Sequence, residues 1–197
     1  RVALARRASR GVIAALRERG IEPVVTLYHF TLPAWFAARG GWLCKDSTKY
    51  FLRFVEYTVA ALADKVKWWV TVNEPNIYAL EGYIRANFPP GKSDMKTAMR
   101  VQANLLRGHA AGYRAIHEIQ PEARVGYALH FRPQEAHRSW SPLDKFRRNL
   151  KFKAINMAFP SAISTGVMRT PLGNVAIPDA KGTQDYSGLN YYSVDTV

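Results

Sequence analysis

The chain has 197 residues, of which 48% are hydrophobic, so it is long enough and apolar enough to bury a core of its own. Its 28 lysine and arginine residues against 15 acidic residues give a formal net charge of +13, but they are dispersed and accompany no nucleic-acid-binding motif, so we expect neither nucleic acid nor a membrane as a partner. A single cysteine excludes an internal disulfide. The sequence has neither an apolar run of roughly 18 to 20 residues, which a membrane span requires, nor a signal-peptide pattern, so we expect a cytoplasmic protein.

The first predicted elements are an amphipathic helix and a short strand. Val12, Ile13 and Leu16 recur at helical spacing, and Gly20 stands where the left-handed residue that ends a helix is expected. Residues 24–28, Val-Val-Thr-Leu-Tyr, then have the β-branched and apolar character of a strand.

A second helix is predicted from about Ser47 to Asp64. Its apolar positions fall on one stripe, which comprises Phe51, Phe54, Val55, Val59 and Leu62. We expect this stripe to face the core.

An apolar strand that ends abruptly in polar residues follows this helix. Residues 68–72, Trp-Trp-Val-Thr-Val, predict a buried strand, and Asn73, Glu74 and Pro75 come directly after it. The carboxyl end of a parallel strand is where α/β proteins place ligands, and apolar surroundings favour the protonated form of a carboxyl group. Glu74 is therefore a candidate general acid, although a glutamate before proline can also be merely the first residue of a loop.

The rest of the chain continues the alternation of helices and strands. Ser93 predicts the start of a long helix that ends near Gln120. A strand at 125–129, a helix around 143–157 and a strand at 186–191 follow. Strands that alternate with helices require a parallel sheet with right-handed crossovers, so the predicted fold class is α/β.

Five stretches, in order along the chain, resemble motifs of glycoside hydrolase family 1, the β-glucosidase family. They are Leu27-Tyr28-His29-Phe30-Thr31-Leu32-Pro33, Gly40-Gly41-Trp42, Thr71-Val72-Asn73-Glu74-Pro75, Phe88-Pro89-Pro90-Gly91 and Gly188-Leu189-Asn190-Tyr191-Tyr192. The resemblance implies a (β/α)8 TIM barrel, of which this chain would hold strands three to six, or about four β/α units. A complete barrel takes about 250 residues, and the chain begins at Arg1 rather than a methionine. We therefore expect residues 1–197 to be one partial domain, either an excerpt of a longer protein or a truncated product.

The resemblance also assigns roles to particular residues. The family hydrolyses β-glycosides with retention of configuration, using one glutamic acid as acid/base and a second glutamate as nucleophile. By position Glu74 would be the acid/base, Asn73 would bind the sugar 2-hydroxyl, and His29 would bind another hydroxyl. Tyr192 would orient the nucleophile, with Asn190 near the site. A structural role for His29 and aromatic packing for Tyr192 are the alternatives.

Three aromatic residues, Trp35, Trp42 and Phe88, are candidates for a rim around the aglycone, and core packing is equally open for each of them. Two positions depart from the family pattern. Phe30 stands where tryptophan is commoner, and Thr31 where aspartate is commoner, which affects hydrogen bonding near the preceding histidine.

The nucleophile motif of the family, threonine-glutamate-asparagine-glycine, does not occur in the sequence. We therefore expect the complete protein to act on a β-glucoside or related glycoside and this chain alone to be inactive. The resemblance implies no metal and no organic cofactor. An inactive half-barrel that binds carbohydrate or serves as a scaffold is the alternative. In either case the open edges of four central barrel strands predict self-association or pairing with the missing barrel portion.

Overall fold

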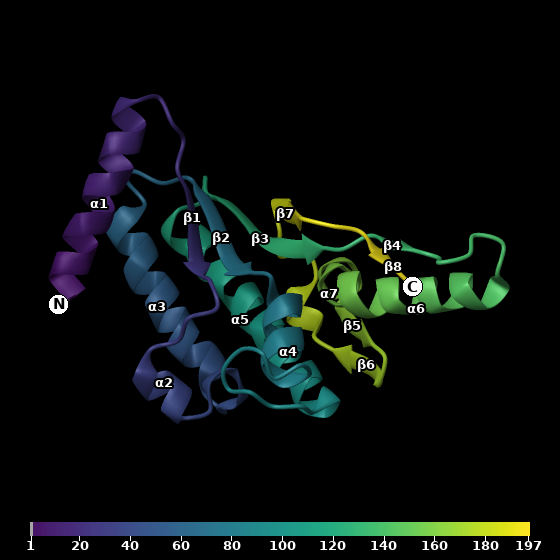
Figure 1. Cartoon of the computed structure of the whole chain (residues 1–197). Coiled ribbons are helices and arrows are strands. Elements are labelled where there is room, and N and C mark those ends of the chain that lie inside the picture. Colours follow the sequence, from purple (N-terminus) through teal and green to yellow (C-terminus); the bar gives the residue numbers. More distant parts are fainter. Residues whose placement is uncertain (1) are drawn as a thin grey trace.

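The computed structural model describes residues 2–197, with side chains from residue 7 onward, as helices alternating with parallel strands (Figure 1). The helices are α1 Val2–Glu18, α2 Ala34–Ala38, α3 Ser47–Leu62, α4 Pro75–Tyr83, α5 Met95–Ile119, α6 Pro142–Asn156 and α7 Ala158–Thr165, with short 3-10 helices η1 Gly41–Leu43 and η2 Pro178–Ala180. The strands are β1 Val24–Tyr28, β2 Trp68–Asn73, β3 Arg124–Phe131, β4 Gln134–Glu135, β5 Val167–Thr170, β6 Gly173–Ala176, β7 Tyr186–Tyr191 and β8 Asp195–Thr196.

Four strands form the main sheet, in the order β1-β2-β3-β7, and every neighbouring pair is parallel. The predicted α/β class and parallel sheet are confirmed, and the strand expected at 186–191 is β7. Because the strands are parallel, their carboxyl ends lie at one edge of the sheet. The segments that follow β1, β2, β3 and β7 therefore meet there.

Helices α3 and α5 lie side by side against the sheet (Figure 1). α5 and Gln120, the residue directly after it, contact β2 through two buried polar contacts. The indole N–H of Trp69 donates to Gln120 over 3.0 Å, and the hydroxyl of Thr71 lies 2.5 Å from Nδ1 of His109. Nε2 of His109 contacts the carbonyl of Thr183 at 2.7 Å. Burial lowers the pKa of His109 to about 4, so this histidine is neutral at physiological pH and serves as a hydrogen-bonding link inside the core.

Two details of the predicted helices are wrong. The long helix is capped by Asp94, whose carboxylate accepts from the N–H groups of Lys96 and Thr97, whereas the hydroxyl of Ser93 donates to the carbonyl of Ile84. On α3 the stripe is buried except at Phe54, which is 48% exposed. Because the hydroxyl of Ser93 is hydrogen-bonded to Ile84, it does not cap the helix, and Asp94, the next residue, does so instead.

Several elements were not predicted from the sequence. Helix α4 begins directly after Glu74 with Pro75 at its first turn. Strands β5 and β6 form a small antiparallel hairpin, and β4 pairs with β8. Gly20, by contrast, has the predicted left-handed backbone, with φ of 72°, just beyond the end of α1. Among the helices that the structure describes, none is long and apolar enough to cross a membrane.

The contact of β3 with β7 requires a glycine at position 126. A Cβ atom there would overlap the backbone carbonyl oxygen of Tyr186 and lie 3.0 Å from carbons of its ring. The close approach fixes the register of β7 against β3 at the pair Gly126 and Tyr186.

We expect Gly126→Ala to lower the free energy of unfolding by about 1–3 kcal/mol, because the added methyl group forces the two strands apart. Gly11→Ala on α1 is the matched control. A Cβ at Gly11 meets no atom within 4 Å, so alanine there should be neutral or stabilising by up to about 1 kcal/mol. Urea unfolding of both variants measures the difference. Equal effects would contradict the close approach of β3 and β7.

Candidate active site

Glu74 stands at the carboxyl end of β2 in a backbone conformation that glutamate rarely adopts. Its φ of 45° and ψ of 54° are left-handed, which is strained for a residue with a side chain. The strain is held by hydrogen bonds on both sides: the N–H of Glu74 donates to the carbonyl of Ala128 over 2.7 Å, and its carbonyl accepts from the N–H groups of Ile77 and Tyr78. This turn directs the chain from β2 into α4.

The Glu74 side chain is only 8% exposed, and an amide from another strand binds it. Nδ2 of Asn190, near the end of β7, lies 2.8 Å from Oε1 of Glu74 and 3.0 Å from Oδ1 of Asn73. An amide nitrogen has two hydrogens, so Asn190 donates to both acceptors at once. Residues separated by more than a hundred positions in the sequence are thereby joined at one point.

The polar network continues to β1. With its oxygen occupied by Asn190, Asn73 turns its own amide nitrogen toward Nε2 of His29, at 3.2 Å. A nitrogen that accepts this hydrogen bond is unprotonated, which leaves the proton of a neutral His29 ring on Nδ1. The predicted residues His29, Asn73, Glu74 and Asn190 therefore lie in one continuous chain of contacts.

His130, on β3, is a site residue that was not predicted from the sequence. Its Nδ1 atom lies 3.4 Å from Oε1 of Glu74, and its side chain is 9% exposed. The same sequence pattern that indicates Asn73 and Glu74 also applies to His130, because it is a polar residue at the carboxyl end of a predicted strand.

Tyr192 follows β7 and lies on the exposed side of the network. Its ring stacks on that of His130, with 5.1 Å between centroids and 26° between planes. The negative charge of Glu74 raises the pKa of the Tyr192 phenol above its ordinary value. Tyr192 and Asn190 thus both come within reach of Glu74 from β7 and the segment that follows it.

The three candidate rim aromatics lie in different environments. Trp42 has no exposed surface and packs between the rings of Tyr28 and Phe51, at 5.2 and 5.3 Å, so it belongs to the core and a rim role is excluded. Phe88 is half-buried at 5.7 Å from Phe30 and lines a cavity of about 670 Å³. The Phe30 ring lies 5.1 Å from the ring of His29, so this cavity adjoins the network.

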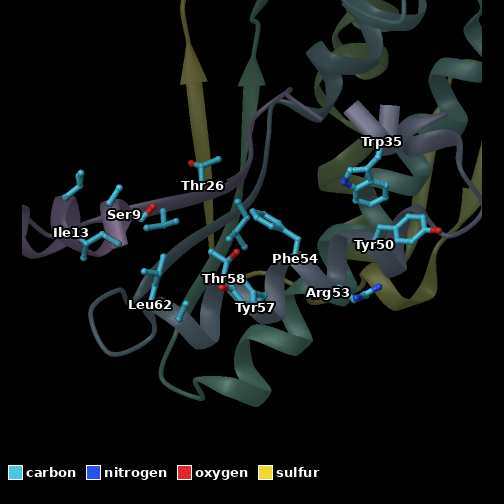
Figure 2. Close-up of a pocket in the computed structure, with 15 residues that line it drawn as sticks. Ser9, Ile13, Thr26, Trp35, Tyr50, Arg53, Phe54, Tyr57, Thr58 and Leu62 are labelled. Atoms are coloured by element: carbon cyan, nitrogen blue, oxygen red, sulfur yellow. The ribbon is translucent and has the colours of Figure 1, made fainter. Parts of the chain in front are cut away.

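Trp35 lines a different cavity, of about 1090 Å³, which Glu74 and its network do not reach (Figure 2). Figure 2 shows Ile13 of α1, Thr26 of β1 and Leu62 of α3 around it. Its lining is largely apolar. Within residues 2–197, no cluster of three or more histidine, cysteine, aspartate or glutamate side chains is arranged to hold a metal ion.

Comparison with known families assigns the chain. The sequence model of glycosyl hydrolase family 1 matches residues 10–197, nearly the whole chain. The chain belongs to this family. The resemblance carried by the five motifs is thereby confirmed, as is the assignment of the fold to part of a (β/α)8 barrel.

Family 1 relatives and structures match at moderate identity. The chain is 38% identical over 114 residues to β-glucosidase A of Acetivibrio thermocellus, covering 58% of this chain and 25% of that protein. It is 25% identical over 209 residues to the cytosolic β-glucosidase of Homo sapiens, covering 92% of this chain and 44% of that protein. The β-glycosidase from Pyrococcus horikoshii superposes with a TM-score of 0.88 at 34% identity, over 96% of this chain and 43% of that one.

A further solved relative was determined with a bound ligand. The β-glucosidase from Thermotoga maritima in complex with deoxynojirimycin superposes with a TM-score of 0.87 at 26% identity, over 95% of this chain and 45% of that one. The chain thus spans less than half the length of the family 1 proteins it matches.

The contact between Tyr192 and Glu74 predicts a change in phenol titration. Replacing the carboxylate by a neutral amide in Glu74→Gln removes the negative charge, so the pKa of Tyr192 should fall toward its ordinary value. Carbon NMR of ring-labelled tyrosine against pH measures it. Glu81→Gln is the control, because Glu81 pairs with Arg85 and Asn87 instead. A Tyr192 pKa that does not move in Glu74→Gln would contradict the site geometry.

Proposed function

We propose that this chain supplies the acid/base half of a retaining β-glycosidase site that acts on β-glucosides, with Glu74 as the acid/base. The observation that carries the proposal is the Glu74 carboxyl group, buried at the carboxyl ends of the strands and held there by Asn190. Family membership supports it. An inactive scaffold is not favoured, since the matched relatives are named as glycosidases.

The proposed chemistry uses Glu74 twice. Protonated Glu74 gives its proton to the departing glycosidic oxygen while a second carboxylate attacks the anomeric carbon and forms a glycosyl-enzyme intermediate. The ionised Glu74 then takes a proton from a water molecule, which displaces the enzyme carboxylate and releases the sugar with retained configuration.

Asn73 and His29 are proposed to bind the sugar. They are already hydrogen-bonded to each other, and Asn73 is also held by Asn190, so the amide of Asn73 has a fixed orientation. Groups that are ordered before the substrate arrives lose less conformational freedom on binding and hold the reacting atoms in place. The exposed side of His29 remains open to a sugar hydroxyl.

The nucleophile is proposed to come from a part of the barrel that this chain does not contain. In retaining enzymes the two carboxyl groups stand about 5–5.5 Å apart. The side chains in contact with Glu74 are an amide, an imidazole and a phenol, from Asn190, His130 and Tyr192. Tyr192 lies on the exposed side of Glu74, where its hydroxyl could orient the missing carboxylate.

We expect purified chain to leave 4-nitrophenyl β-glucoside intact, because it lacks the nucleophile. A chimera in which residues 10–197 replace the matching segment of Thermotoga maritima β-glucosidase should hydrolyse it. In that chimera Glu74→Gln should lower kcat by about 10²–10⁴-fold on glycosides with poor leaving groups, the usual contribution of a general acid/base.

The matched control in the chimera is Glu81→Gln, an acidic residue on α4 that is paired with Arg85 and lies outside the polar network. It should retain activity. Efficient hydrolysis by the chain alone, or a fully active Glu74→Gln chimera, would contradict the assigned role.

We propose further that the open edges of the sheet associate with a second copy or with the remaining barrel portion. β1 and β7 are the outer strands of the four-stranded sheet within residues 2–197. The outward side chains of β7 include Leu189, 64% exposed, and Tyr191, 59% exposed. At the other edge the apolar cavity of Figure 2 opens beside β1. Unpaired strand edges with apolar side chains recruit partners.

Light scattering of the purified chain at micromolar concentration should show dimers or larger species. The net charge of +13 opposes association, but repulsion between surface charges is screened beyond about 8 Å at physiological ionic strength. Leu189→Lys together with Tyr191→Lys on β7 should shift the distribution toward monomer. A compact monomer with slow amide exchange along β1 and β7 would contradict the proposal.

A further inference from the structure

His130 has a place in the site that the assigned roles do not use. It occupies the position next to last on β3, directly opposite Asn190 in the ladder between β3 and β7. Both side chains reach the same atom: Nδ2 of Asn190 lies 2.8 Å from Oε1 of Glu74, and Nδ1 of His130 lies 3.4 Å from it. Oε1 therefore faces two nitrogen atoms from two neighbouring strands.

We infer that His130 is a positioning residue for the proposed reaction, whose Nδ1–H group holds Oε1 of Glu74 so that the transferable proton is carried on Oε2. The inference rests on the proposed function, because it assigns the acid proton of Glu74 to one of its two oxygens. It goes beyond that function by naming His130 as the residue that determines which oxygen of Glu74 carries the proton.

The chemistry of hydrogen bonding leads from these contacts to Oε2. In a neutral carboxyl group one oxygen carries the proton and the other only accepts. Oε1 already accepts from the amide N–H of Asn190. If Nδ1 of His130, 3.4 Å away, carries a hydrogen, Oε1 faces a second donor and is the accepting oxygen, because a proton on it would point at hydrogens. Glu74 can thus be protonated without losing either contact, provided that the proton is on Oε2.

The second ring nitrogen of His130 makes no hydrogen bond within the described part of the chain that would explain the position of the ring. Nε2 of His130 is buried and has no hydrogen-bond partner among the described residues. A buried polar atom without a partner is destabilising, so nothing on the Nε2 side accounts for the placement of the ring. A neutral imidazole has one donor and one acceptor nitrogen, and Nδ1–H toward Oε1 makes Nε2 the acceptor.

Three contacts keep the ring and the carboxylate together. The ring stacks on Tyr192. The backbone carbonyl of His130 accepts from Nδ2 of Asn76 over 2.8 Å, and the N–H of Glu74 donates to the carbonyl of Ala128. The end of β3 is thus bonded to the chain at Glu74 and two residues beyond it, so the backbone of His130 and the turn that carries Glu74 are held together.

The first test is the protonation pattern of His130 in the unmodified chain, measured by nitrogen NMR of labelled histidine at neutral pH. We expect a neutral ring protonated on Nδ1. Glu74→Ala should change the Nδ1 resonance, whereas Glu81→Gln should leave it unchanged. A ring protonated on Nε2, or an Nδ1 resonance that ignores Glu74→Ala, would overturn the inference. This measurement requires no activity.

The second test uses the active chimera and compares leaving groups. His130→Ala should lower kcat/KM at least about tenfold on methyl β-glucoside, whose leaving group needs a proton, and by less than about twofold on 2,4-dinitrophenyl β-glucoside, whose leaving group does not. His130→Asn, with an amide N–H near the place of Nδ1, should restore most of the loss. An equal loss on both substrates, or no rescue by asparagine, would mean a merely structural role.

The two tests separate this inference from the proposed function. An active chimera that depends on Glu74 but shows no leaving-group effect of His130→Ala overturns the inference and leaves the function intact. A chimera that is inactive for any reason tests only the function, and the tautomer of His130 in the unmodified chain then decides the inference.

Discussion

The hydrogen bonds of a single amide nitrogen hold the site together. Nδ2 of Asn190 donates both its hydrogens, one to Glu74 on the turn after β2 and one to Asn73 at the end of the same strand. Because Asn73 is then committed as an acceptor at its oxygen, its nitrogen points to His29. The orientations of Asn73 and His29 follow from this one donor, and they depend on parallel strands that end at the same edge.

The backbone around Glu74 serves the same arrangement. A left-handed glutamate is strained, and such strain persists only where surrounding contacts maintain it. Here Pro75 ends the strand and begins α4, while the end of β3 binds the turn through Ala128 and His130. The result is a carboxyl group that leaves the sheet abruptly, is almost wholly buried, and presents Oε1 to the network.

The sequence predicts the elements from local pattern and most of the site from the family resemblance. An apolar strand that ends in polar residues makes Glu74 a candidate without any tertiary information, and the motifs that resemble family 1 assign its role and those of the residues around it. The sequence is insufficient where two neighbouring residues are equally suited to one role. Ser93 and Asp94 are both good N-caps for α5, and the hydrogen bond from Ser93 to the carbonyl of Ile84 decides between them. Likewise Trp42 is a core residue, and His130 acquires a role only through a carboxylate on another strand.

The most direct measurement is the side-chain amide resonance of Asn190 in the nitrogen–proton NMR spectrum, with and without the Glu74 carboxylate. Asn190 and Glu74 are 116 positions apart, so only the parallel arrangement of β2, β3 and β7 brings them together. In Glu74→Ala the two amide protons of Asn190 should shift and exchange faster with water, whereas in Glu81→Gln they should not. An Asn190 amide that is unaffected by Glu74→Ala would contradict the gathering of these strand ends into one site.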